Sequence, residues 1–130
     1  MKNSKLQLGA RVLLGIIYFV FGLNGFLQFL PMPPLPESAG SFLGALVATG
    51  YFFPVLKGTE VIMGGLLLAG LAAPLALVVL APITLQIFLF HSILTPGLQN
   101  VVLPVVMIAL HVIAAMGYWN LYAPLFKKNA

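Results

Sequence analysis

Apolar residues form four long runs in this chain, and short segments with proline, glycine or polar residues separate them. The runs cover residues 9–30, 53–71, 74–94 and 101–122. Each holds about 20 residues, which is the length that an α-helix needs to cross the hydrocarbon core of a bilayer. The pattern predicts an all-α integral membrane protein: an antiparallel bundle of four transmembrane helices that forms one domain over residues 1–130.

The segment between the first two runs predicts a stiff loop and then a short helix. Four prolines between residues 31 and 36 each fix their own φ angle and favour extended backbone before them. Ser41 then offers an N-cap to an apolar stretch that Gly50 ends. Because this stretch is too short to cross a bilayer, we expect an interfacial or re-entrant helix between spans 1 and 2.

Composition and charge agree with a membrane protein and predict its orientation. The chain is 62% hydrophobic and 6% charged, so it lacks the polar side chains that cover a water-soluble globule. Positive charges in bacterial membrane proteins gather on the cytoplasmic side. We therefore expect the bacterial inner membrane, with both termini cytoplasmic, and we explain the basic balance by topology rather than by nucleic-acid binding. Five of the six cations flank the first and last spans: Lys2, Lys5, Arg11, Lys127 and Lys128.

Polar side chains are few inside the spans, and Glu60 is the only acidic one among them. An acidic residue at the centre of a membrane helix costs roughly 2.5 to 3.5 kcal/mol on insertion scales, so it marks a functional place. We predict a polar pocket that opens toward the outer side, with Glu60 as its catalytic residue. The candidate ligand-binding residues are Asn24, Gln28, Lys57, Gln86, His91 and His111.

Helical spacing suggests how these groups face one another. Asn24 and Gln28 are four residues apart and are expected to share a face, as are Lys57, Glu60 and Gly64. Lys57 either extends to the outer interface or pairs with Glu60 and keeps it charged.

Each of the other polar residues also has a structural interpretation. Asn24 and Gln28 suit hydrogen bonds between helices, and His111 suits a bond to a backbone carbonyl. Gln86 and His91 lie about 140° apart around one helix, so one of them is expected to face a neighbouring helix or another subunit.

A haem or metal site is not expected. The two histidines, His91 and His111, differ by roughly 8 to 10 Å in depth at about 1.5 Å per residue, whereas the axial ligands of a haem lie at nearly one level. A metal site that adds Glu60 meets the same difficulty. The chain has no cysteine, which excludes a disulfide framework and a thiol relay within it.

Three segments resemble the DoxX family: LGIIYFVFGLNGFLQF in the first span, LKGTEVIMGGLLLAG in the second and LAPITLQIFLFH in the third. The resemblance covers most of the chain and includes Gly22, Glu60, Gly64 and Gly70. It implies a four-helix inner-membrane protein, and some members of the family are membrane subunits of oxidoreductases, including thiosulfate to quinone electron transfer. Many relatives place a lysine where this chain has Gly25, so that Lys57 or a histidine has to replace the missing partner of Glu60.

Three functions fit these observations. The first is an accessory or quinone-binding subunit of a membrane redox system, in which Glu60 and a histidine exchange protons with the quinone. The second is a proton-coupled transporter of small molecules, and the third is a structural or lipid-binding membrane protein. The chain has no self-contained catalytic motif, so an oxidoreductase role requires a redox partner; contact with the lipid bilayer is expected in all three cases, and a homo-oligomer is compatible with each.

Overall fold

The computed structural model describes residues 4–29 and 34–127, and within these ranges it contains helices and no strand. The elements in chain order are α1 (Ser4–Leu27), α2 (Glu37–Ala48), α3 (Phe52–Ala69), α4 (Ala73–Leu89), the π-helix η1 (Phe90–Leu94), α5 (Leu98–Met116), α6 (Trp119–Tyr122) and the 3-10 helix η2 (Ala123–Phe126). Four stretches are long and apolar enough to cross a membrane: Lys5–Leu27, Phe52–Ala69, Ala73–Leu94 and Leu98–Met116. The predicted all-helical fold is confirmed, and these stretches support a multi-pass membrane protein.

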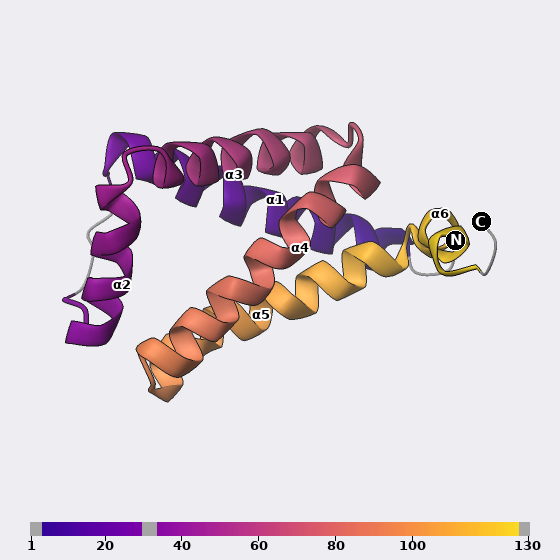
Figure 1. The fold of residues 1–130 in the computed structure, drawn as a ribbon. Coiled ribbons are helices and arrows are strands. Elements are labelled where there is room, and N and C mark those ends of the chain that lie inside the picture. Colours follow the sequence, from indigo (N-terminus) through magenta and orange to yellow (C-terminus); the bar gives the residue numbers. More distant parts are fainter. Residues whose placement is uncertain (1–3, 30–33, 128–130) are drawn as a thin grey trace.

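The core lies where the long helices meet. α1 packs along α3, α4 packs along α5, and α1 also contacts α5 (Figure 1). Four buried alanines, Ala10, Ala73, Ala76 and Ala114, let the backbones approach closely, as small residues do in membrane helices. The larger side chains of this core are Leu14, Tyr18, Leu67, Leu77, Leu80 and Met107.

Glycines set the close approach of α1 and α3. A Cβ atom added at Gly64 would lie 2.6 Å from the backbone nitrogen of Phe19, and one added at Gly15 would lie 3.0 Å from the backbone oxygen of Gly64. Real Cβ atoms essentially never come as close to backbone atoms as 2.6 Å, so residue 64 needs glycine, and a side chain at residue 15 would require the neighbouring backbone to shift. The two helices therefore meet backbone to backbone along this seam.

The short helix α2 runs across the direction of α3 at one end of the molecule (Figure 1). It begins at Glu37, earlier than the Ser41 start that the sequence suggested. Pro36 has a φ of −57°, which already suits a helix, and Glu37 places a negative charge in the first turn. The rings of Phe42 and Phe90, with centroids 6.1 Å apart, connect α2 to η1.

The last span ends at Met116 rather than near residue 122. A turn at Gly117 and Tyr118 follows it, and the chain then continues in α6 and η2. Tyr122 donates a hydrogen bond of 2.6 Å from its hydroxyl to the carbonyl oxygen of Pro74, at the start of α4. Tyr118, Trp119 and Tyr122 thus belong to a separate segment after the span.

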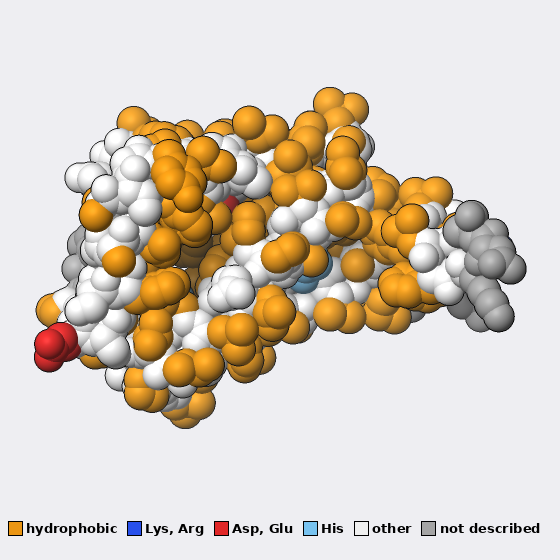
Figure 2. Space-filling model, viewed as in Figure 1, with side chains coloured by type: hydrophobic (Ala, Val, Ile, Leu, Met, Phe, Trp, Pro, Cys, Tyr) orange, Lys and Arg blue, Asp and Glu red, His pale blue; other side chains and the backbone are white. Residues whose placement is uncertain are grey.

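Hydrophobic side chains cover most of the visible surface over the long helices (Figure 2). Such a surface suits contact with lipid tails and not with water. The same view shows the molecule hollowed between α2, α3 and α4.

Candidate functional site

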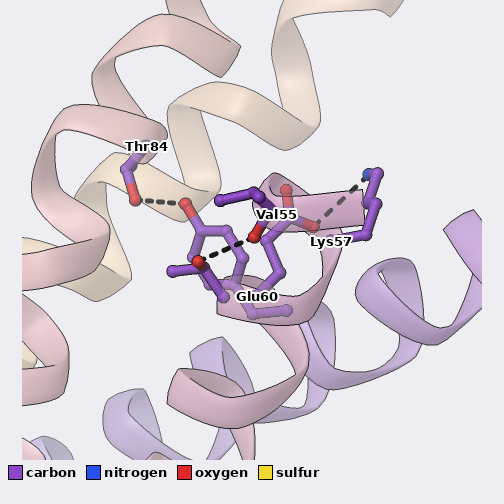
Figure 3. Close-up of polar contacts among 6 residues, drawn as sticks. Val55, Lys57, Glu60 and Thr84 are labelled. Atoms are coloured by element: carbon purple, nitrogen blue, oxygen red, sulfur yellow. Dashed lines mark hydrogen bonds and ion pairs between the residues drawn. The ribbon is translucent and has the colours of Figure 1, made fainter. Parts of the chain in front are cut away.

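Lys57 and Glu60 form an ion pair on α3. The Lys57 ammonium donates to the Glu60 carboxylate with an Nζ–Oε1 distance of 3.4 Å (Figure 3). The Glu60 side chain is 4% exposed and the Lys57 side chain 24% exposed. Residues three apart on a helix share a face, which brings the two side chains together. The pair thus joins a buried carboxylate to a cation that remains accessible.

Two glycines of α1 make room for this pair. A Cβ atom at Gly22 would lie 3.0 Å from Cβ of Glu60, and one at Gly25 would lie 2.3 Å from Cγ of Lys57. Gly22 therefore lets α1 close over the carboxylate. Gly25 leaves the space that the Lys57 stem occupies on its way to Glu60.

A buried chain of hydrogen bonds links three other helices. The hydroxyl groups of Tyr18 on α1 and Thr84 on α4 are hydrogen-bonded to each other (Figure 3), and the Thr84 hydroxyl is 2.9 Å from Nδ1 of His111 on α5. The other ring nitrogen of His111, Nε2, is 2.8 Å from the carbonyl oxygen of Leu77. All three side chains are buried.

The carbonyl at the end of this chain sets its direction. A carbonyl oxygen only accepts, so Nε2 of His111 carries a proton and donates to Leu77. In neutral His111, Nδ1 is then an acceptor, so the Thr84 hydroxyl donates to it. Thr84 in turn accepts from the Tyr18 hydroxyl, and every donor in the chain has an acceptor.

The ion pair and the hydrogen-bonded chain lie next to each other. Tyr18 and Gly22 are four residues apart on α1 and share a face, and Gly22 abuts Glu60. Side chains of α3, α1, α4 and α5 therefore form one polar centre inside an otherwise apolar molecule.

An apolar groove lies between α3 and α4. Its volume is about 320 Å³, and its lining residues are Tyr51, Phe52, Val55, Leu56, Thr59 and Ile83. The Thr59 hydroxyl donates to the backbone oxygen of Val55 in its own helix, at 2.8 Å. The groove thus offers mostly hydrocarbon and aromatic contacts, and two of its lining residues, Thr59 and Ile83, are the chain neighbours of Glu60 and Thr84.

Three other predicted site residues lie apart from Glu60 or face outward. Gln28 is exposed beyond the end of α1, in the left-handed region with a φ of 51°, and its backbone N–H donates to the oxygen of Asn24 at 2.8 Å. The helical face that Asn24 and Gln28 were expected to share is therefore absent, because the helix ends at Leu27. Gln86 is exposed on α4.

His91 lies in η1 and is bonded to its own helix. Its Nδ1 is 2.8 Å from the carbonyl oxygen of Ile87. Because a carbonyl only accepts, Nδ1 carries the proton and Nε2 is the remaining acceptor. The ring is half-buried and meets the ring of Phe90 edge-on, with centroids 5.2 Å apart. His91 thus belongs to the end of the molecule where α2 lies.

Asn24 lies on α1, directly before Gly25, which the Lys57 stem contacts. It is half-buried and has an interaction partner. Of the predicted residues, Lys57, Glu60 and His111 thus belong to the polar centre, and Asn24 and Gln86 lie on two of the helices that build it.

Neither Tyr18 nor Thr84 is among the site residues that the sequence suggests. A tyrosine in the middle of a span, away from the aromatic belts at the interfaces, is the signal that identifies it. Its ring is 1% exposed and its hydroxyl joins α1 to α4. Tyr18 therefore belongs to the candidate site.

The arrangement of these side chains does not resemble a metal centre. Both ring nitrogens of His111 are hydrogen-bonded to protein groups. No group of three or more His, Cys, Asp or Glu side chains with metal-binding geometry occurs within residues 4–29 and 34–127. The site contains a carboxylate, an ammonium, two hydroxyls and an imidazole. These are groups that can give or take protons.

No protein-family model, curated protein or solved structure matches this chain.

Proposed function

We propose that this protein is a membrane-embedded binding module for a quinone-type amphiphile and serves as an accessory subunit of a membrane redox system. The observation that carries the proposal is the Lys57–Glu60 pair, a buried carboxylate with an accessible ammonium 3.4 Å away. Ionisable residues inside membrane spans are rare and mark ligand or proton sites.

The chemistry of a quinone suits this pair. Its two oxygens carry negative charge when it is reduced, and each then takes a proton. The Lys57 ammonium stabilises such an oxygen by charge, and Glu60 is the group that gives or takes the proton. The electrons come from a redox partner, because the side chains of the site transfer protons but not electrons.

The apolar groove supports the same proposal. A quinone has an apolar tail, and the groove between α3 and α4 offers Phe52, Leu56 and Ile83 to it. Ligand sites of this kind combine apolar walls with a few polar groups. The resemblance to the DoxX family, some of whose members take part in quinone-linked electron transfer, points in the same direction.

The proposed setting is the bacterial inner membrane, with antiparallel spans and both termini cytoplasmic. Among the described residues, Lys5 and Arg11 lie on α1 and Lys127 follows η2, which suits the positive-inside rule. Lys2 and Lys128 lie outside the described residues.

The short helix α2 is proposed to lie at the outer interface. It has 12 residues. With a rise of about 1.5 Å per residue its length is about 18 Å, too short to cross roughly 30 Å of hydrocarbon. In the proposed topology the first span begins on the cytoplasmic side and ends on the outer side. Because α2 follows this span in the chain, it lies on the outer side.

Extraction of the purified protein tests this function. The wild-type protein should release a quinone into organic solvent, and Glu60→Gln should release at least tenfold less. Glu37→Gln is the matched control, because Glu37 is the other acidic residue of the chain and is exposed on α2. Equal amounts of quinone from Glu60→Gln and Glu37→Gln, or none from any of the three proteins, would overturn the proposal.

A second pair of variants tests the groove. Ile83→Trp fills the groove, whereas Leu85→Trp adds the same bulk to an exposed position of the same helix, α4. We expect loss of quinone only from Ile83→Trp. If both proteins keep it, the tail lies elsewhere.

A further inference from the structure

The hydrogen-bonded chain from Tyr18 to His111 ends inside the protein. His111 is 8% exposed, Thr84 4% and Tyr18 1%. The last donor of the chain, Nε2 of His111, is held by the carbonyl oxygen of Leu77, which neither gives nor takes a proton. A proton that reaches Nδ1 of His111 along these hydrogen bonds therefore arrives through Thr84.

The other end of the chain lies near Glu60. Tyr18 is on α1, and a Cβ atom at Gly22, one turn further along the same helix, would lie 3.0 Å from Cβ of Glu60. The titratable or charged groups around the chain are Lys57 and Glu60 on α3, Tyr18 on α1 and His111 on α5. Of these, Lys57 has the most accessible side chain at 24%.

We propose that Tyr18 and Thr84 relay a proton between Glu60 and His111, so that His111 is a proton store inside the membrane. The relay rests on the proposed proton exchange at Glu60, but it does not depend on which ligand binds there. It gives a role to the hydroxyls of Tyr18 and Thr84 and to the His111 imidazole. The binding of a quinone does not require these groups.

The transfer balances without an oxidant or a reductant. Once the Glu60 carboxylate has taken up a proton, that proton passes to the Tyr18 oxygen, directly after a side-chain rotation or through one water. The Tyr18 proton passes to Thr84, and the Thr84 proton passes to Nδ1 of His111. Three O–H bonds break, two O–H bonds and one N–H bond form, and the pair becomes a Glu60 carboxylate and a His111 imidazolium.

Each of the two charges formed in this transfer has a polar partner. The Lys57 ammonium, 3.4 Å from Glu60, compensates the new negative charge. The imidazolium keeps its bond to Leu77 and now donates from Nδ1 to Thr84, so the direction of the chain reverses. Thr84 then donates to Tyr18, and Tyr18 donates toward Glu60. The heavy atoms of the hydrogen-bonded chain, which runs from the Tyr18 hydroxyl through Thr84 and His111 to the Leu77 carbonyl, do not move.

The rate at which His111 gains and loses a proton tests the relay. The chain contains two histidines, so NMR of protein labelled at histidine shows two ring signals, and His91→Gln assigns them. Exchange between neutral and protonated His111 is measured from line shapes during a pH titration in nanodiscs. We expect Thr84→Val to slow this exchange by at least tenfold, since positioned proton carriers contribute about 10² to 10⁴ in rate.

Matched variants separate the relay from a loss of structure. Thr84→Ser keeps the hydroxyl and should exchange at nearly the wild-type rate, and Tyr18→Phe, which breaks the chain at its other link, should be as slow as Thr84→Val. Proton exchange at His111 should be slow in Glu60→Gln and as fast as in the wild type in Glu37→Gln. Wild-type exchange rates in Thr84→Val and Tyr18→Phe, or a His111 that stays neutral throughout the titration, would overturn the relay.

This measurement uses no quinone. If the protein contains no quinone but exchange is slow in Thr84→Val, the relay is supported and the proposed ligand is wrong. If the protein contains quinone but exchange in Thr84→Val is unchanged, the ligand is supported and the relay is wrong.

Discussion

The stem of Lys57 fills the space beside Gly25. A Cβ atom at residue 25 would lie 2.3 Å from Cγ and 2.7 Å from Cδ of Lys57. The lysine of α3 thus lies across α1 next to Glu60, in the region where the resemblance to the DoxX family leads one to expect a lysine on α1. A glycine at residue 25 is what allows the cation to come from residue 57.

The first prediction concerns Gly25→Ala. The new methyl group should displace the Lys57 stem and separate Lys57 from Glu60, which opposes the gain of about 0.5–1 kcal/mol that alanine brings to a helix interior. In a Lys57→Ala background the same change should give more of this gain, because only the contact with Cβ of residue 57, at 3.0 Å, remains. The free energies of unfolding of the four proteins should show a coupling of about 1 kcal/mol, within the range for residues in contact. Additive effects would show that Lys57 does not pack on Gly25.

The second prediction concerns the seam between α1 and α3. In Gly64→Ala the methyl group meets the backbone of Phe19. This should destabilise the protein by about 1–3 kcal/mol, because rigid backbone does not move aside as a side chain does. Gly58→Ala is the control on the same helix, with nothing within 4 Å of its added Cβ. It should be neutral or slightly stabilising in thermal unfolding. A Gly64→Ala protein as stable as Gly58→Ala would show that the helices are not in backbone contact.

The fold follows from the sequence at the level of its long helices. Four apolar runs of the right length specify four candidate spans, because hydropathy and length depend on local composition. The ends of the elements follow less directly. The last span stops at Met116 although apolar and aromatic residues continue to Tyr122, since α6 instead packs toward the start of α4 through the Tyr122–Pro74 hydrogen bond.

The candidate site follows from the sequence only where neighbours share one helix. Lys57 and Glu60 are three residues apart, so spacing was enough to suggest their pairing. Tyr18, Thr84 and His111 lie on three helices, and their contact depends on how these helices pack, which the sequence does not specify. Gln28 shows the converse case, because it has the right spacing from Asn24 but lies beyond the end of α1.

The third prediction concerns Tyr122, which lies outside the spans. Burial, followed by the neighbouring Tyr118, raises the pKa of the Tyr122 hydroxyl above its ordinary value of 10.0. The folded protein thus favours the neutral phenol, so its contribution to stability is fully present below about pH 10 and is lost as the pH rises through the raised pKa. The thermal stability of Tyr122→Phe should fall less steeply than that of the wild type at alkaline pH. Parallel curves would show that Tyr122 titrates alike in the folded and unfolded states.

The fourth prediction concerns orientation. The chain has no cysteine, so a single cysteine reports one position. Ser38→Cys on α2 should react with a membrane-impermeant maleimide in intact cells, whereas Asn120→Cys on α6 should react only after the membrane is permeabilised. Both positions are exposed in the structure. Labelling in the opposite order would reverse the proposed topology, and labelling of both in intact cells would exclude it.

Titration of quinone-free protein in nanodiscs with a short-chain quinone tests the central claim, that the Lys57–Glu60 pair binds the ligand. Glu60→Gln and Lys57→Met should each raise the Kd at least tenfold, about 1.4 kcal/mol of binding free energy. The double variant should bind no more weakly than either single variant, because the two residues act as a pair, and Glu37→Gln should bind as the wild type does. Equal Kd values for the wild type and Glu60→Gln would contradict the account.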